Sequence, residues 1–247
     1  MEAKLLLKYV LINLKAVSEY RADFLFKNVM MLLNNSIFYS VFIFMASRFD
    51  GISFLSYTDI ICGLAIGHLS YAIGLNFYRG IIDVQDWIIN GELDTLLIRP
   101  VGIYWHILVK KINESAISEC IWAIILLFLV PMDRWLFVIS FSLLGAIIIH
   151  FAVFIWSLIP FFVDTNRELK SFEMIISFQL YPPVIFDNLL RFMALYIFPG
   201  GMLSFGPVIA SHYPGFFIPY FSMVILLPIL FFILLKLGLY RYRSAGY

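Results

Sequence analysis

The sequence predicts an all-α integral membrane protein with six transmembrane helices, an N-terminal interfacial helix and a re-entrant outer hairpin before the last span. The first reason is composition: 62% of the residues are hydrophobic, 13% are charged and the mean hydropathy is +0.94. A soluble chain of this length could not cover its surface with polar groups. The second reason is that apolar stretches of membrane-spanning length recur along the chain. We find no repeat or linker, so residues 1–247 are predicted to form a single transmembrane domain.

The first 22 residues predict a helix that lies in the membrane surface rather than a span. The apolar stretch Leu5–Leu14 is too short to cross a bilayer, and Lys8 interrupts it. Apolar side chains alternate with lysines there, as in helices that bind at the membrane interface. The alternative is that these residues are the charged start of the first span.

Six apolar stretches have about the 17–25 residues that a helix needs to cross the hydrocarbon core. Their predicted limits are 27–47, 57–78, 111–131, 136–160, 171–187 and 217–238. With the N-terminus in the cytoplasm, only Arg48, Arg134 and Arg191 of the 17 Lys and Arg residues fall outside. Because cytoplasmic loops are enriched in Lys and Arg, this favours a multi-pass protein with both termini cytoplasmic.

Residues 182–219 hold six of the ten prolines and several glycines, yet Leu189–Phe205 is apolar enough to enter lipid. A full crossing would move the basic C-terminal end to the outside, against the charge bias. We therefore predict a broken hairpin that enters from the outer face and returns, where protein or a water-filled cavity covers its irregular backbone. Its central residues are Pro199, Gly200, Gly201 and Pro207. The alternative is an extracellular loop on the surface.

Most enzymatic signals are missing from the sequence. It contains no G-x-x-x-x-G-K-[ST] phosphate loop, no metal-ligand cluster at helical spacing and no convincing nucleophile–base pair. We therefore expect no catalytic residue, metal or cofactor in this chain, and the net charge of +1 gives no sign of nucleic-acid binding. The four scattered histidines are expected to be hydrogen-bonded packing residues.

Several polar and small residues lie inside the predicted spans. Glu119 is a candidate for the substrate pathway or for a structural partner, because a buried carboxylate is costly unless it is paired or protonated. Asn34 and Asn35 either bond a neighbouring helix or line the same path. A small-residue face allows close approach of another helix, in this chain or in a second copy. That face consists of Gly63, Gly67 and Gly74.

The polar segment between the second and third spans predicts a two-turn amphipathic helix. Its apolar stripe has the i, i+3, i+4 spacing of one helix face and consists of Leu93, Leu96 and Leu97. Gly91 can end the preceding segment, and Pro100 ends this one. We interpret such a helix on a water-facing loop as a docking element for another protein.

These features together resemble the permease subunits of ABC-2 type ABC exporters, most closely a six-span subfamily with a G-x-L-D-x-x-L-x-R-P loop. The matching residues are Gly91, Leu93, Asp94, Leu97, Arg99 and Pro100. The C-terminal stretch Arg241–Gly246 is similar to the basic Y-x-S-A-G ending of that branch.

The resemblance implies a bacterial inner (plasma) membrane protein that forms a pore with a second permease, identical or related. Two separate nucleotide-binding (ATPase) subunits would bind ATP and Mg²⁺, dock on the cytoplasmic side and drive export. The loop would be the coupling element, formed by Gly91, Glu92, Leu93, Asp94, Leu96, Leu97, Arg99 and Pro100. The outer hairpin would gate exit, and the transported substrate stays open.

Two other classes are possible from the sequence. A membrane-embedded lipid-processing enzyme would need clustered polar residues near one interface, and we find none. A secondary transporter usually has two matching halves and charges near the midplane, and neither feature is evident.

Overall fold

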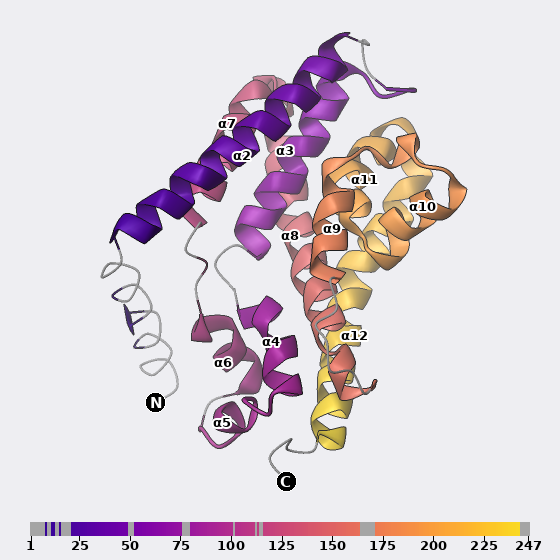
Figure 1. Ribbon diagram of the computed structural model, residues 1–247. Coiled ribbons are helices and arrows are strands. Elements are labelled where there is room, and N and C mark those ends of the chain that lie inside the picture. Colours follow the sequence, from indigo (N-terminus) through magenta and orange to yellow (C-terminus); the bar gives the residue numbers. More distant parts are fainter. Residues whose placement is uncertain are drawn as a thin grey trace.

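The computed structural model describes residues 8, 11, 12, 15, 21–48, 52–75, 80–100, 102–111, 113, 116–163 and 171–242. Helices and the turns that join them make up this part of the chain, and no β-strand occurs within it (Figure 1). The predicted surface helix of the first 22 residues falls largely outside the described residues, as does most of the basic C-terminal ending. The all-α prediction is confirmed.

Helix α3 (Tyr57–Gly74) lies at the centre and contacts five other helices. They are α2 (Arg21–Arg48), α7 (Ala116–Leu129), α8 (Trp135–Ser157), α9 (Ser171–Leu180) and α11 (Gly200–His212). Most of the residues of α3 are buried, and many of them are Gly, Ala or Ser. Small side chains let neighbouring backbones approach, so this helix is the packing axis of the bundle.

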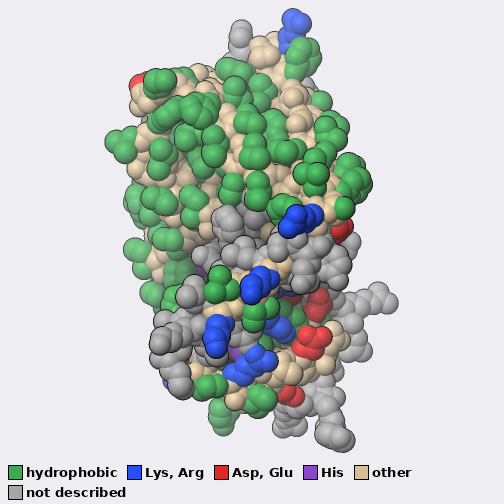
Figure 2. All heavy atoms as spheres, turned by 90° about the vertical axis from the view of Figure 1, so that its left-hand side faces the viewer, with side chains coloured by type: hydrophobic (Ala, Val, Ile, Leu, Met, Phe, Trp, Pro, Cys, Tyr) green, Lys and Arg blue, Asp and Glu red, His purple; other side chains and the backbone are tan. Residues whose placement is uncertain are grey.

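Two long helices lie at the periphery and expose apolar side chains. Helix α2 (Arg21–Arg48) leans across α7, and α12 (Phe217–Arg241) packs along α8 (Figure 1). By length and composition, the segments Arg21–Arg48, Met132–Phe161 and Pro214–Arg241 can each cross a membrane. Figure 2 shows the belt of exposed hydrophobic side chains that these lengths require.

The predicted hairpin region is a bent helix pair. Helix α10 (Asn188–Phe192) continues into the π-helical turn η4 (Met193–Ile197), and α11 follows at an angle of 100°. This pair counts as a fourth candidate span if it crosses as one unit, or as a re-entrant segment if it returns. Residues Gly200–Ala210 of α11 are all buried in protein, as irregular backbone at membrane depth requires.

Two predicted spans have shorter helices than expected among the described residues. The stretch 171–187 contains α9, which ends at Leu180 because Pro182 and Pro183 lack the amide hydrogens that would continue it. The stretch 111–131 contains α7, which has 14 residues. Length and composition identify three or four candidate spans in the described part of the chain, and the six-span arrangement stays a prediction.

One end of the bundle carries three short helices: α4 (Gly80–Ile89), α5 (Asp94–Leu97) and α6 (Ile103–Lys110). We call it the α5 end. Charged side chains gather below the apolar belt in Figure 2, at this end of the molecule. Apolar side chains of α4, α6, α8 and α12 join in one core cluster, so the short helices are built onto the long ones.

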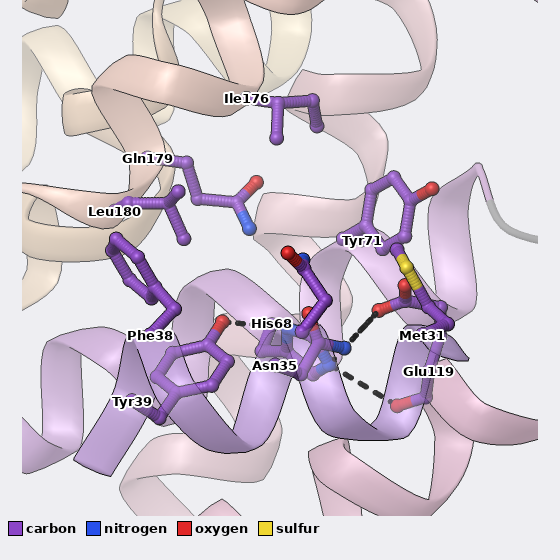
Figure 3. Close-up of a pocket in the computed structure, with 11 residues that line it drawn as sticks. Met31, Asn35, Phe38, Tyr39, His68, Tyr71, Glu119, Ile176, Gln179 and Leu180 are labelled. Atoms are coloured by element: carbon purple, nitrogen blue, oxygen red, sulfur yellow. Dashed lines mark hydrogen bonds and ion pairs between the residues drawn. The ribbon is translucent and has the colours of Figure 1, made fainter. Parts of the chain in front are cut away.

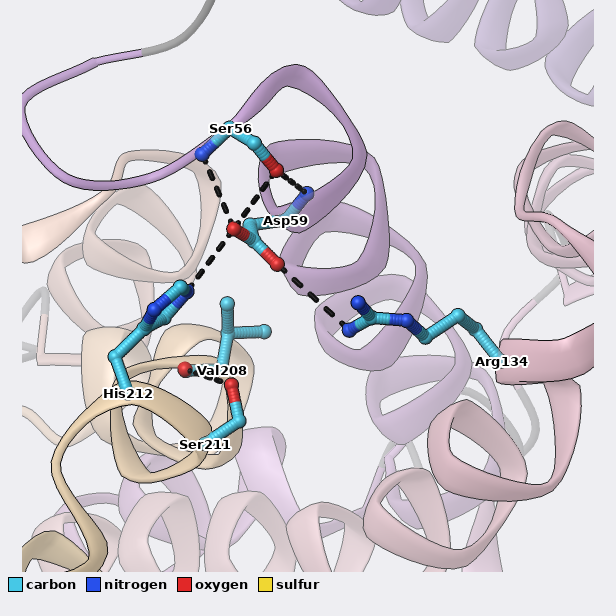
Figure 4. A network of polar contacts seen from close by, with 6 residues as sticks. All are labelled: Ser56, Asp59, Arg134, Val208, Ser211 and His212. Carbon is cyan, nitrogen blue, oxygen red and sulfur yellow. Dashed lines mark hydrogen bonds and ion pairs between the residues drawn. The ribbon is translucent and has the colours of Figure 1, made fainter.

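The opposite end is fixed by a polar network around Asp59 (Figure 4). Its carboxylate accepts hydrogen bonds from the backbone and side chain of Ser56, at 3.1 and 2.8 Å, which closes a capping box at the start of α3. His212 Nε2 lies 3.0 Å from the same carboxylate, and Arg134 Nη1 lies 3.8 Å from it. The network joins the first turn of α3 to the end of α11 and the start of α8.

Candidate functional site

The loop of residues 91–100 lies at the α5 end and is positioned by one glycine. Gly91 has a φ of 75°, the left-handed region that favours glycine, and it follows the last turn of α4. The reversal lets the amide of Leu93 donate to the carbonyl of Trp87 at 3.0 Å. The prediction that Gly91 ends the preceding segment is therefore confirmed.

The helix that follows is a single turn, so the prediction of two turns is wrong. Helix α5 covers Asp94–Leu97, and Ile98, Arg99 and Pro100 continue as a turn and bend. Pro100 cannot donate a backbone hydrogen bond and disfavours helical backbone at the residue before it. The loop of residues 91–100 is therefore a short projection with one helical turn, which we call the peg.

The apolar stripe of this peg is divided between the core and the surface. Leu93 and Leu96 are 1% and 2% exposed and belong to the core cluster of the α5 end. Leu97 and Ile98 are 43% and 84% exposed. The prediction that Leu93, Leu96 and Leu97 present one outward face is wrong, because the first and second anchor the loop to its own chain.

Close packing and charge hold the peg against α4 and α6. A Cβ at Gly80 would collide with the carbonyl oxygen of Ile107, so these two helices touch through their backbones. Lys110 Nζ lies 3.7 Å from the centre of the Trp87 ring and 3.8 Å from the carboxylate of Glu92. Burial lowers the pKa of Lys110, and the carboxylate of Glu92 counters part of that effect.

The C-terminal end of α12 also reaches this loop. Burial raises the pKa of the Tyr242 hydroxyl to about 12, and the nearby carboxylate of Asp94 adds to the effect. Two separate parts of the sequence pattern, the loop aspartate and the tyrosine of the C-terminal ending, are therefore neighbours. No local sequence pattern indicates this contact.

A second candidate site is a cavity of about 280 Å³ between α2, α3, α7 and α9 (Figure 3). All three predicted pathway residues line it: Asn34, Asn35 and Glu119. Residues that sequence reasoning did not single out complete the polar part of the wall: Tyr39, His68, Tyr71 and Gln179. The rest is apolar and consists of Met31, Phe38, Ile176 and Leu180.

Hydrogen bonds order the polar wall. Asn35 Nδ2 donates to Glu119 Oε2 at 3.3 Å, and His68 Nε2 lies 3.2 Å from the same oxygen and 3.2 Å from the backbone oxygen of Glu119. The hydroxyl of Tyr39 lies 2.7 Å from His68 Nδ1. For Asn35, the alternative of bonding a neighbouring helix is confirmed, because its partner Glu119 lies on α7. Asn35 also lines the cavity, and its place on a substrate path stays a prediction.

Two buried acceptor atoms on this wall have no hydrogen-bond partner among the described residues. They are Glu119 Oε1 and Gln179 Oε1, and these two residues are only 2% and 3% exposed. A buried acceptor without a partner is costly and calls for an explanation.

The small-residue face of α3 is filled within this chain. A Cβ at Gly63 would collide with the ring of Phe205, and one at Gly67 would lie 2.9 Å from both Gln179 Cγ and Ser204 Cβ. One at Gly74 would lie 2.9 Å from Ala146 Cα. Of the two partners considered from sequence, these contacts place helices of the same chain against the face, and a second copy is not needed there.

A bundle of apolar helices with a charged, helix-bearing loop at one end defines a multi-pass membrane protein. A family profile described as ABC-2 family transporter protein matches residues 29–246. The chain therefore belongs to the ABC-2 family of transporter proteins and is an ABC-2 type permease, a transport subunit rather than an enzyme. No curated protein and no solved structure matches the chain in the corresponding comparisons.

Proposed function

We propose that this chain is the transmembrane subunit of an ATP-driven ABC exporter. In this proposal six spans cross the plasma membrane, both termini are cytoplasmic, and the bent pair α10–α11 is a re-entrant hairpin on the outer side. A separate nucleotide-binding subunit binds ATP and Mg²⁺ and docks at the α5 end. A second permease, identical or related, completes the pathway.

The observation that carries the proposal is that the apolar residues of the loop are partly buried in the chain and partly exposed. Leu93 and Leu96 are buried in the chain's own core, while Leu97 and Ile98 stand exposed beside them. Adjacent exposed apolar side chains on a charged, water-facing peg are unfavourable unless another surface covers them. An ATPase subunit with an apolar groove fits this need, and family membership implies such a partner.

The anchored base of the peg supplies a route for coupling. Leu93 and Leu96 pack in the same cluster as residues of α8 and α12, and α4 contacts α8 directly. A displacement of the exposed residues Leu97 and Ile98 therefore moves the whole core cluster of the α5 end rather than a flexible loop, because close-packed interiors transmit strain. We infer that this cluster passes closure of the ATPase subunits to the long helices.

The proposed dimer needs a face other than the glycine face of α3. Helices α2 and α12 present the long exposed apolar surfaces of the described chain, and each is available to lipid or to a second copy. Interface mutations that test dimerisation belong on these helices rather than at Gly63 or Gly67.

The test is the pair of substitutions Leu97→Asp and Ile98→Asp at the exposed tip. A charge placed in a desolvated interface should cost about 2–5 kcal/mol, so binding to the ATPase subunit should weaken by about 1.5 to 3.5 orders of magnitude. Met132→Asp is the matched control, because Met132 is a highly exposed apolar residue at the opposite end.

The measurements are co-purification of the ATPase subunit, and ATP hydrolysis and export by the reconstituted complex, with permease expression as reference. We expect normal membrane insertion for all three variants, and lost docking and export for the two loop variants only. Wild-type ATPase binding and export by Leu97→Asp and Ile98→Asp would show that this loop is not the coupling element.

A further inference from the structure

The cavity between α2, α3, α7 and α9 has an unbalanced charge. Glu119 is the acidic residue of its described lining, and no Lys or Arg belongs to that lining. His68 does not have to be protonated to satisfy its contacts. Its neutral form can donate from Nε2 to Glu119 and accept the Tyr39 hydroxyl hydrogen at Nδ1.

The two buried atoms of the wall that lack a hydrogen-bond partner are both acceptors. Asn35 and His68 both contact Glu119 Oε2, which leaves Oε1 without a donor, and Gln179 Oε1 is in the same state. Figure 3 shows Gln179 extending from α9 toward the group formed by Asn35, His68 and Glu119. A ligand that satisfies these two oxygens must therefore bring hydrogen-bond donors.

The remaining wall favours an organic cation over a metal ion. No group of three or more His, Cys, Asp or Glu side chains gathers anywhere in the described part of the chain. Aromatic rings of Phe38, Tyr39 and Tyr71 and aliphatic side chains face the cavity instead. Aromatic faces attract organic cations, and aliphatic side chains pack against an apolar body.

We propose that this cavity is a binding site for small amphipathic cations, a protonated amine on an apolar body, carried as substrate. The ammonium group donates to Glu119 Oε1 and Gln179 Oε1, and the apolar body lies against the aromatic and aliphatic wall. The volume of about 280 Å³ is at the small end for ligand sites, so the ligand is smaller than a typical drug. The transport role of the site rests on the proposed function; its ligand preference does not.

Gly67 belongs to this site as a shaping residue. Gln179 Cγ reaches to within 2.9 Å of where a Cβ on Gly67 would be, so the side chain of Gln179 lies directly over the glycine. A larger residue at position 67 must shift Gln179 or Ser204, which lie equally close to it.

The test compares three ligands of nearly the same shape and different charge: 4-phenylbutylamine, 4-phenylbutanol and 4-phenylbutyrate. Equilibrium binding of each radiolabelled compound is measured on the full-length permease in phosphatidylcholine nanodiscs, with empty nanodiscs as background. We expect saturable binding of the amine, at least about tenfold tighter than the alcohol, because hydrogen bonds to charged groups are the stronger ones. The carboxylate should bind weakest.

Two variants and one control locate the site. Glu119→Gln removes the charge with little change of shape and should weaken amine binding by about 10- to 100-fold, with a clearly smaller loss for the alcohol. Glu173→Gln is the matched control, because Glu173 is exposed on α9 and does not line the cavity. Gln179→Met removes the second acceptor without a charge change and should weaken the amine by about three- to tenfold.

Equal affinity for amine and alcohol in the wild type would overturn the proposal, as would wild-type amine binding by Glu119→Gln. If Glu119→Gln does not purify as a folded protein, the ligand series and Gln179→Met decide. The assay contains neither ATPase subunit nor nucleotide. Amine binding without ATPase docking would therefore contradict the proposed function alone, and docking without amine binding would contradict this inference alone.

Discussion

Three histidines are each bonded to a partner on another helix. His68 meets Tyr39 of α2, His150 meets the backbone of Gly74 in α3, and His212 meets Asp59. Sequence reasoning predicted hydrogen-bonded packing histidines, and these contacts confirm it. The identity of the partners was out of reach, because each pair joins residues far apart in the chain.

Among the residues that line the cavity, some could be predicted from the sequence and others could not. Glu119 and Asn35 stand out in the sequence because polar groups inside apolar spans are costly. Gln179 carries the same signal, because it lies at the middle of the predicted span 171–187, but it was not singled out. Tyr39 carries a weaker one, because its ring is apolar and only its hydroxyl is polar. Their roles follow from the crossing of helices, which no local pattern encodes.

Asp59 should be a stabilising residue at the end opposite the peg. Asp59→Ala removes the oxygen that accepts from Ser56 and His212, so the capping box and the His212 contact are lost together. We expect a loss of about 1.5–3 kcal/mol and a lower midpoint of thermal unfolding in nanodiscs. Asp133→Ala is the control, because Asp133 is exposed on the neighbouring turn η1 (Met132–Arg134). Equal midpoints for both variants would contradict the assignment.

Gly91 should be intolerant of any side chain. Gly91→Ala forces an L-residue into the left-handed region and should cost about 1–2 kcal/mol. Gly102→Ala is the matched control nearby, since Gly102 has a φ of −54° and a new Cβ meets only ordinary contact at 3.6 Å. Thermal unfolding of the two variants is compared. A Gly91→Ala protein as stable as Gly102→Ala would show that the loop adopts another conformation.

The elements differ in how well the sequence predicts them. Long apolar helices such as α8 and α12 follow from runs of hydrophobic residues alone. The peg was predicted by its i, i+3, i+4 pattern, but that pattern cannot show whether a leucine faces its own chain or a partner. Leu93 and Leu96 turn inward because the reversal at Gly91 folds the loop back onto α4 and α6.

The hairpin depends on the close approach of α11 to α9. A Cβ at Gly200 would collide with the backbone oxygen of Ile175, and backbone cannot move aside as a flexible side chain can. Gly200→Ala should destabilise the protein by about 1–3 kcal/mol and increase proteolysis in this region. Gly215→Ala is the control in the same glycine-rich stretch, because nothing lies within 4 Å of its new Cβ. Similar protease sensitivity for both variants would argue against the packing of α11 on α9.

For the whole molecule, composition alone predicts the class, and the family comparison over residues 29–246 agrees with it. The number and limits of spans are less predictable. Helix α3 carries Asp59, His68 and many small residues, so its hydropathy is modest although most of its residues are buried. A helix that is covered by protein on all sides does not need the lipid-like surface on which hydropathy analysis depends.

The proposed topology predicts which exposed positions face the outside of an intact cell. The starting variant lacks both native thiols, Cys62 and Cys120. Single cysteines at Met132 and Asp187 should react with a membrane-impermeant maleimide, because both residues are exposed and belong to the proposed outer side. A cysteine at Ile98 should react only after the membrane is permeabilised, although Ile98 is the more exposed residue of the peg.

This pattern follows from the distribution of charge, since Lys and Arg are retained on the cytoplasmic side and the peg lies among them. The label at Asp187 also tests the hairpin separately from the overall orientation. If Met132 labels from outside and Asp187 does not, the orientation stands and α10–α11 is not a re-entrant outer hairpin. If Ile98 labels in intact cells, the peg faces the outside, and an ATPase subunit in the cytoplasm could not reach it.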